Sequence, residues 1–223
     1  MKFFSKVLFL FTVIFFNESY AEKYYSIYKI STKGIVIGEL IWNLNINNEK
    51  YSLKIDIQNK DYLSYFYKFK GSYYAEGIVK NGILESKHYS QKWLTNKKNR
   101  NIKIVFNNSR IENIKQEPLE KEFPRIDFYT LNGYSDPLTS FVKLLSGSKV
   151  SKTVDGRRTY TFSFVESDSN NNKKFELNNY TNIWTDHKKN NFDSISFENG
   201  VNKFLPSLIS IDIKTSTFKI TPD

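Results

Sequence analysis

The sequence predicts a mainly β protein, built as one large curved antiparallel sheet or half-barrel of roughly ten strands wrapped around one short helix at residues 136–146. Segments in which apolar and polar residues alternate recur along the chain, which is the pattern of half-buried strands. Asn-Gly and Asp-Gly pairs, the strongest short hairpin signals, separate several of these segments. The chain offers no series of helical segments that could connect parallel strands, so the strands are expected to be antiparallel.

The N-terminal segment 1–21 predicts a signal peptide that is cleaved after Ala21. It begins with two lysines, continues with an apolar run at 7–16, and ends in the small-x-small pattern Ser19-Tyr20-Ala21. A transmembrane anchor is the alternative, but the run is shorter than the roughly 20 residues that span a bilayer. We therefore expect a periplasmic or secreted protein, without a membrane span, in which residues 22–223 form a single β-rich domain.

The composition limits the classes of protein that fit. The 223 residues include no cysteine, which excludes disulfides, thiolate metal sites and a lipid attached at a cysteine. About 200 mature residues can nevertheless bury a sizeable core. The net charge of +10 is compatible with an anionic partner, but the chain is rich in Lys, Asn and Ile, the residues of A/T-rich codons, and this compositional explanation is favoured. Export argues against nucleic acid as the partner.

The strands of the first half follow from their alternation and their turns. Asn81-Gly82 predicts a tight hairpin between 71–80 and 83–93. Gly38 predicts a bulge or bend in a long second strand. The segment 63–70 (LSYFYKFK) also alternates and is predicted as strand. The remaining predicted strands of this half are 23–31, 34–47, 51–57 and 102–106.

The second half contains the helix and a further set of strands. The charged segment 112–125 holds Pro118 and Pro124, and is predicted as an irregular connection. Asp155-Gly156 predicts a second tight hairpin. The strands predicted after the helix are 150–154, 159–165, 175–184, 192–197 and 208–214, with Phe218 and Ile220 closing the chain.

The helix is predicted from its ends and from one apolar stripe. Asp136 can cap the first turn, Pro137 suits the first helical position, and Gly147 can end the helix. The stripe recurs with the period of a helix and should face the sheet. Its members, which we also predict as an apolar ligand-binding face, are Leu138, Phe141, Val142 and Leu145.

The aromatic content predicts a ligand groove. Aromatic residues make up 17% of the chain, and one short helix is too small to cover the concave face of a large sheet. The uncovered part would be a groove lined by Phe and Tyr, which suits a lipid or another apolar small molecule. The alternative is a fully closed sheet in which the aromatic residues only form the core.

A basic turn is the most suggestive feature of the predicted surface. Trp93 lies there among cations and could contact an anionic surface or a protein of the bacterial envelope. The alternative is a solvated hairpin tip in which Trp93 packs inward. The residues of this predicted contact turn are Lys92, Trp93, Lys97, Lys98 and Arg100.

Catalytic chemistry has little support. His88 and His187 have no partners at the spacing of a metal site. Asp127 and Asp136 flank the start of the helix, but Asp136 is explained as a cap. Neither a G-x-S-x-G motif nor a glycine-rich phosphate loop is present. We expect no catalytic, cofactor-binding or metal-binding residues, and rank a hydrolase below a binding protein or an interaction protein.

Several weak motifs occur together in an order that resembles the domain of unknown function family 3108, which groups exported bacterial envelope proteins. They are Tyr28, Gly34 and Gly38 in the first strands, Ala75-Glu76-Gly77, Asn81 to Leu84, Tyr89, residues 101–106, the helix 136–145, Asp155 to Arg158 with Tyr160, and Leu205-Pro206. The tyrosine-rich segment 62–74 and the lack of a proline near Glu85 depart from the family pattern. The resemblance implies a mostly antiparallel β protein with no established activity, and transfers no catalytic residue.

Overall fold

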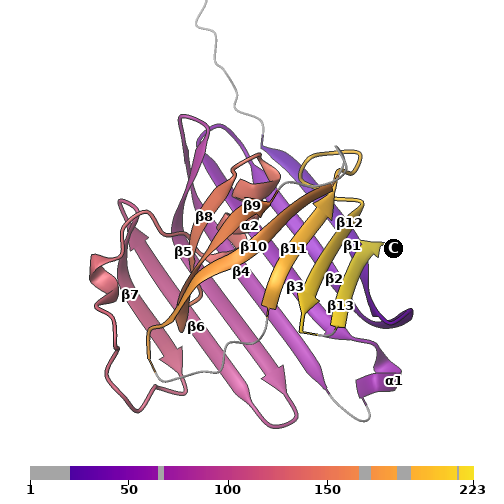
Figure 1. The fold of residues 1–223 in the computed structure, drawn as a ribbon, viewed down its shortest axis with the longest axis horizontal. Helices are drawn as coiled ribbons and strands as arrows, with labels where there is room; N and C mark the ends of the chain where they lie inside the picture. The colour runs from indigo at the N-terminus through magenta and orange to yellow at the C-terminus, as the bar shows by residue number, and fades with distance from the viewer. Residues whose placement is uncertain (1–20, 65–67, 166–171, 185–191, 215) are drawn as a thin grey trace, which may run out of the picture.

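The structure is a computed structural model that describes residues 21–64, 68–165, 172–184, 192–214 and 216–223. Residues 1–20 of the predicted signal peptide and His187 lie outside the described residues. The same holds for residues 65–67, whose side chains the sequence assigned to alternating faces of a strand. Everything that follows concerns the described part of the chain, which is drawn in colour in Figure 1.

One antiparallel sheet of thirteen strands forms the molecule, in the order β7-β6-β5-β4-β3-β2-β1-β13-β12-β11-β10-β9-β8. β8–β13 lie in front of β2–β7 in Figure 1, with the helix α2 between the two layers. The strands are β1 Glu22–Thr32, β2 Ile35–Ile46, β3 Lys50–Asn59, β4 Phe69–Lys80, β5 Ile83–Thr95, β6 Asn99–Asn107, β7 Arg110–Glu117, β8 Val150–Val154, β9 Arg158–Val165, β10 Asn172–Asn182, β11 Phe192–Glu198, β12 Leu208–Ile213 and β13 Ser216–Pro222. The predicted curved antiparallel sheet is confirmed, with thirteen strands rather than roughly ten.

The inner face of the sheet forms the core because apolar residues alternate along the strands. In β2, for example, Leu40, Trp42 and Leu44 are buried while the residues between them are not. The turns have the predicted chemistry: Asn81 and Gly82 both have positive φ, as a two-residue hairpin requires. Opposite Gly38 the pairing of β1 with β2 shifts register, which confirms the predicted irregularity there.

The predicted strand at 63–70 is wrong at its beginning. A short helix, α1, covers Asp61–Ser64, and β4 begins only at Phe69. The backbone N–H groups of Leu63 and Ser64 both donate to the carbonyl of Lys60, at 3.0 and 3.2 Å. This helical turn reverses the chain between β3 and β4, and local alternation could not indicate it.

The predicted irregular connection at 112–125 is wrong in its first half, because Arg110–Glu117 forms β7. The pairing of β6 with β7 shifts register between Val105 and Phe106. Ile111 and Ile114 therefore both face the core although they are three residues apart. This bulge hides the period of two that would have identified the strand.

The helix is confirmed as α2, Pro137–Leu145. The Asp136 side chain accepts a hydrogen bond from the backbone N–H of Thr139, and Gly147 has a φ of +103°. The helix contacts β8, β4 and β5. A short 3-10 helix, η1, covers Phe128–Thr130 in the connection that leads to α2.

The two edge strands of the described sheet, β7 and β8, are joined by the connection between them rather than by direct pairing. Gly133 N donates to Ser109 O at 3.0 Å, just before β7. Ser135 N donates to Lys152 O, and Val154 N donates to Ser135 O, both at 2.9 Å. The connection thus covers sheet edges that would otherwise invite pairing with other chains.

Candidate functional site

A pocket of about 310 Å³ lies where β5 turns into β6, and its described lining consists of Trp93, Thr95, Lys97, Lys98 and Arg100. Trp93 and Thr95 share the inner face of β5 with Tyr89, because they alternate with outward residues. Arg100 pairs with Trp93 across the hairpin and shares the inner face of β6 with Ile102. The pocket therefore belongs to the concave side of the sheet, at one of its ends.

The hairpin tip is held by Thr95. Its hydroxyl oxygen accepts from the backbone N–H groups of Lys97 and Lys98, at 3.3 and 3.0 Å. The backbone N–H of Thr95 donates to Lys98 O at 2.8 Å. These hydrogen bonds fix the backbone of both lysines while their side chains remain exposed.

The aromatic residue in the described lining of the pocket is Trp93. The half-buried ring of Trp93 meets the ring of Phe69 edge-on, with the centroids 5.7 Å apart. The Trp93 indole N–H is buried and has no hydrogen-bond partner in the described part of the chain. A buried donor without an acceptor costs about 1–3 kcal/mol, so a ligand atom that accepts from it would be stabilised.

The charge around the pocket is positive. Within the described residues, the side chains of Lys97, Lys98 and Arg100 form no ion pair with a carboxylate. Glu117 is close to the hairpin, but it accepts from Asn101 at 3.3 Å on the outer face of the sheet. The three cations are therefore available to an anion at the pocket.

The residues of the predicted contact turn lie on both faces of the sheet. Trp93, Lys97, Lys98 and Arg100 come together at the inner pocket, whereas the exposed Lys92 alternates with Trp93 and faces outward. Lys92 lines a different hollow of about 420 Å³, together with residues that include Lys70 and Asp56. The sequence did not separate the two faces of this turn, and the prediction that its residues contact a partner stays a prediction.

The predicted apolar ligand face lies in the core. Leu138, Val142 and Leu145 are buried, as is Leu144, which the sequence analysis did not include. Phe141 is half-buried between Trp42 and Phe197, with ring centroids 5.7 and 5.8 Å away. These side chains already contact protein, and the prediction that they also contact a ligand stays a prediction.

A buried polar network holds the start of α2. The Asp136 carboxylate accepts from the hydroxyls of Ser86 and Thr139, at 2.6 and 2.5 Å, and from Thr139 N at 2.9 Å. Tyr51 bonds the Thr139 hydroxyl at 2.7 Å. Burial raises the pKa of Asp136, and the hydrogen bonds from Ser86 and Thr139 oppose that rise. Every member of the network is satisfied and enclosed, which suits anchoring of the helix rather than chemistry.

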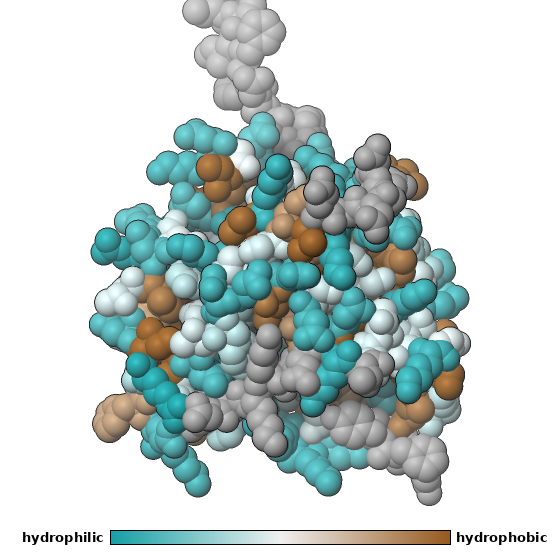
Figure 2. Space-filling model, in the orientation of Figure 1, coloured by the Kyte–Doolittle hydropathy of each residue, from teal (hydrophilic) through white to brown (hydrophobic). Residues whose placement is uncertain are grey.

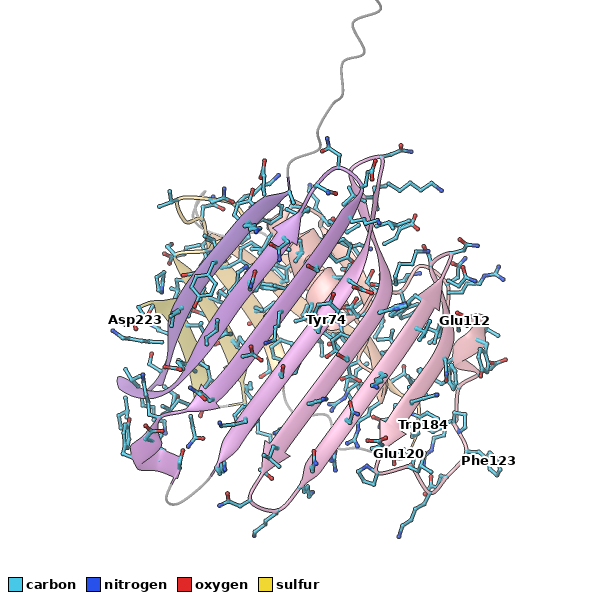
Figure 3. All side chains as sticks on the ribbon, turned by 180° about the vertical axis from the view of Figure 1, so that it is seen from behind. Tyr74, Glu112, Glu120, Phe123, Trp184 and Asp223 are labelled. Carbon is cyan, nitrogen blue, oxygen red and sulfur yellow. The ribbon has the colours of Figure 1, made fainter. Side chains whose placement is uncertain are left out.

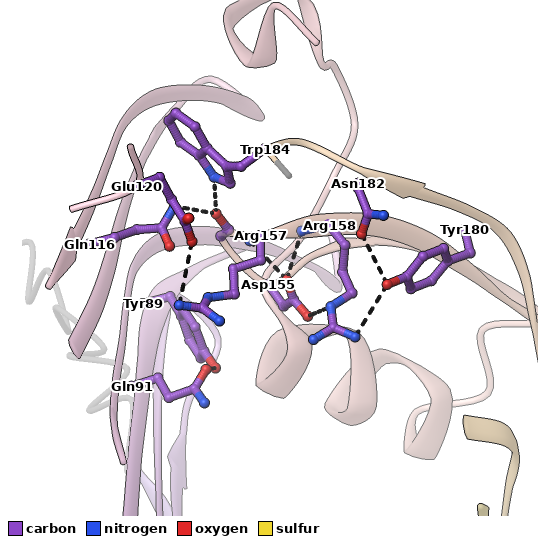
Figure 4. Close-up of polar contacts among 11 residues, drawn as sticks. Tyr89, Gln91, Gln116, Glu120, Asp155, Arg157, Arg158, Tyr180, Asn182 and Trp184 are labelled. Carbon is purple, nitrogen blue, oxygen red and sulfur yellow. Dashed lines mark hydrogen bonds and ion pairs between the residues drawn. The ribbon is translucent and has the colours of Figure 1, made fainter. Parts of the chain in front are cut away.

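A second cluster holds the turn between β8 and β9 against the opposite edge of the sheet (Figure 4). The carbonyl of Gly156 accepts from Gln116 of β7 at 3.1 Å and from the Trp184 indole at 2.8 Å. Asp155 caps the turn by accepting from the N–H groups of Arg157 and Arg158, both at 2.9 Å. The Arg157 guanidinium pairs with Glu120 at 3.4 Å. This cluster links the two edges of the sheet, which is not closed by strand pairing.

Two side chains considered for catalysis in the sequence, His88 and Asp127, have partners of their own in the described structure. His88 is exposed on β5, with Nδ1 3.9 Å from a carboxylate oxygen of Glu76, and Asp127 caps η1 by accepting from Tyr129 N. Tyr74 lies near the centre of the outer face in Figure 3. The described residues contain no group of three side chains arranged to hold a metal ion. In the same residues no helix has the length and apolarity needed to cross a membrane.

The opposite side of the molecule, with β8–β13 in front, is mostly hydrophilic. Its apolar residues lie scattered among polar and charged ones (Figure 2). Three other pockets have a carboxylate in their described lining, whereas the described lining of the pocket at the β5–β6 hairpin combines an aromatic ring with cations alone.

The fold and the pocket together define a class: a curved antiparallel β protein whose concave side ends in an aromatic and basic pocket. The sequence matches the family described as protein of unknown function (DUF3108) over residues 25–223, and the chain belongs to that family. The predicted resemblance is thereby confirmed. No curated protein matches the sequence.

Among solved structures, the chain is similar to a beta-barrel-like protein of the domain of unknown function DUF1849 from Brucella abortus. The identity is 10% and the TM-score is 0.48, with 90% of this chain and 95% of the other covered.

Proposed function

We propose that this protein is a non-catalytic binding protein of the bacterial envelope, exported by its signal peptide, that takes up a lipid-like molecule on the concave side of its sheet. The observation that carries the proposal is the inner-face pocket at the β5–β6 hairpin, which combines the Trp93 ring with three cations that pair with no carboxylate of the described residues. Its volume of about 310 Å³ falls within the range of small-molecule sites, about 300–1,000 Å³.

The position of the helix supports this proposal. The N-terminus of α2 is tied to β5 at Ser86, while the pocket begins at Trp93 of the same strand. Seven residues of extended strand separate the two, which corresponds to roughly 23 Å. The end of the concave side that holds the pocket is therefore distant from the end at which the helix is anchored.

An interaction protein without an internal ligand is the second candidate. The exposed side chains of Lys97 and Lys98 favour it, because cations at a hairpin tip can contact an anionic surface or an envelope protein. This reading predicts binding that weakens strongly with salt, since exposed charges are screened. A hydrolase remains the weakest candidate.

Native mass spectrometry of residues 22–223, purified from a bacterial periplasm without detergent, tests the proposal. We expect a discrete added mass that is lost on denaturation and belongs to an apolar molecule. A bare mass, together with no uptake after incubation with a total lipid extract, would contradict the proposal. Crosslinking from Lys97 and Lys98 in intact cells would then look for a protein partner.

A further inference from the structure

We infer that the ligand is an amphiphilic anion, an apolar chain with one acidic head group, and that the pocket at the β5–β6 hairpin holds its head. This inference rests on the proposed function and names the class of ligand. Arg100, Lys97 and Lys98 would bind the head group, and the ring of Trp93 would pack beside the first part of the chain.

Three cations beside a half-buried aromatic ring are the first argument. Within the described residues no carboxylate pairs with Arg100, Lys97 or Lys98, so an acidic head group would supply the opposite charge that the pocket lacks. The nearby Glu117 is on the outer face and bonds Asn101 instead. Charge-assisted hydrogen bonds from Arg or Lys to an acidic group are roughly twice as strong as neutral ones. The pocket is therefore matched in charge to an anion.

The change in polarity along the inner face is the second argument. From Arg100, the next inward residues of β6 are Ile102 and Ile104, which are 5% and 1% exposed. Ile102 itself lies under Gly156 of the β8–β9 turn, so the apolar surface that the pocket offers to a chain is the Trp93 ring. An amphiphile fits this arrangement with its head at the cations and its first carbons against that ring.

The register of the hairpin is the third argument. Arg100 lies directly opposite Trp93, so the cation and the ring are neighbours on one face. Thr95 fixes the backbone of Lys97 and Lys98 through its hydroxyl. A head group would thus meet two lysines on an ordered turn and an arginine whose strand position is set by the sheet.

Isothermal titration calorimetry with sodium dodecanoate and with 1-dodecanol, both below aggregation, separates the charge from the chain. We expect dodecanoate to bind the mature protein at least about tenfold more tightly than dodecanol. Arg100→Gln should weaken dodecanoate binding by about 10- to 100-fold, the range for losing a hydrogen bond to a charged group. The same variant should leave dodecanol binding unchanged.

The matched control is Lys103→Gln combined with Lys115→Gln. These two lysines pair with each other on β6 and β7, and Lys103 is exposed between the inward residues Ile102 and Ile104. The control removes two charges from the outer face, while Lys97→Gln with Lys98→Gln removes two from the rim. Only the rim variant should weaken dodecanoate binding. Because both lysines of the rim variant are exposed, this variant also replaces Arg100→Gln if that protein does not fold.

The outcomes separate the inference from the proposed function. Equal affinities for dodecanoate and dodecanol, or equal effects of the rim and outer-face variants, would overturn the inference and leave a neutral-ligand carrier. Binding of neither probe, with a bare native mass, would overturn both. If the protein sediments with anionic phospholipid vesicles but takes up no single dodecanoate, the cations serve surface docking and the inference is wrong.

Discussion

At the scale of single residues, Asp136 shows how one side chain serves both the local helix and the whole core. It is fully buried and caps α2, and its carboxylate accepts a hydrogen bond from the Ser86 hydroxyl on β5. The cap could be predicted from the Asp-Pro pair, since it depends on adjacent residues. Its bond with Ser86, and the bond between Tyr51 and the neighbouring Thr139, could not be predicted, because 50 and 88 residues separate the bonded groups.

Replacing Asp136 by Ala should lower the free energy of unfolding by about 2–4 kcal/mol. The helix loses its cap, which is worth about 1 kcal/mol, and buried donors lose their acceptor at about 1–3 kcal/mol. Urea denaturation of the mature protein measures this change. A loss below about 1 kcal/mol would contradict the assigned role of Asp136.

The pH dependence of stability should report the same carboxyl. Burial raises the pKa of Asp136 above its ordinary value of 3.8, so the native state binds this proton more tightly than the unfolded state. Its contribution to stability is therefore present below the unfolded pKa and is lost as the pH rises through the folded pKa. Asp136→Asn lacks this titration.

The difference in unfolding free energy between Asp136→Asn and the wild type should consequently shift in favour of the variant as the pH rises from about 3.8. Urea denaturation of both proteins at several pH values between 3.5 and 7 tests the sign. Other carboxyls titrate in the same way in both proteins and cancel in the difference. Parallel profiles would show that the pKa of Asp136 is not raised.

At the scale of elements, the turn between β8 and β9 has a role that the sequence did not reveal. The Asp-Gly pair correctly predicted a hairpin, because turn chemistry is local. The position of Gly156 against Ile102, 54 residues away in sequence, depends on how the sheet closes. The same limit applies to β7, where a bulge obscured the alternation of buried and exposed residues. It also applies to Lys92 and Trp93, which face opposite sides of the sheet.

Gly156→Ala should destabilise the protein by about 2–4 kcal/mol. Its φ of +88° disfavours a side chain, and an added Cβ would lie 2.5 Å from a methyl group of Ile102. Gly82→Ala is the control, because its φ is +76° and nothing lies within 4 Å of the added Cβ. We expect the control to lose only about 1–2 kcal/mol, the cost of the left-handed conformation.

Chemical denaturation of both glycine variants measures this difference. In an Ile102→Ala background the additional cost of Gly156→Ala should fall toward that of Gly82→Ala, because the crowded methyl group is absent. Equal losses in Gly156→Ala and Gly82→Ala would mean that the turn does not press against β6.

At the scale of the whole molecule, the first and last strands lie side by side in the middle of the sheet, and its two edge strands come close to each other. β1 pairs with β13, so the strands that follow β1 and precede β13 extend away on either side. The connection after β7 and the turn after β8 then bring the two edges together. The connection after Glu117 is seen near Glu120 and Phe123 in Figure 3.

This arrangement explains which part of the candidate site could be predicted. The mainly β class, the antiparallel pairing and the enclosed helix follow from local patterns and are confirmed. The basic turn was also identified, since its lysines are adjacent in sequence. The positions of Trp93 and Arg100 on the concave side, and of neighbouring rings against the apolar stripe of α2, depend on long-range packing. Only the structure shows these positions.

A crystal structure of residues 22–223 with dodecanoate tests whether the pocket at the β5–β6 hairpin holds an acidic head group. We expect the carboxylate within about 3 Å of the Arg100 guanidinium, at hydrogen-bond distance. We also expect the first carbons of the chain against the Trp93 ring, on the inner face of β5 and β6. A ligand bound on the outer face, near Lys92 and Lys70, or no ordered ligand at saturating dodecanoate, would contradict this expectation.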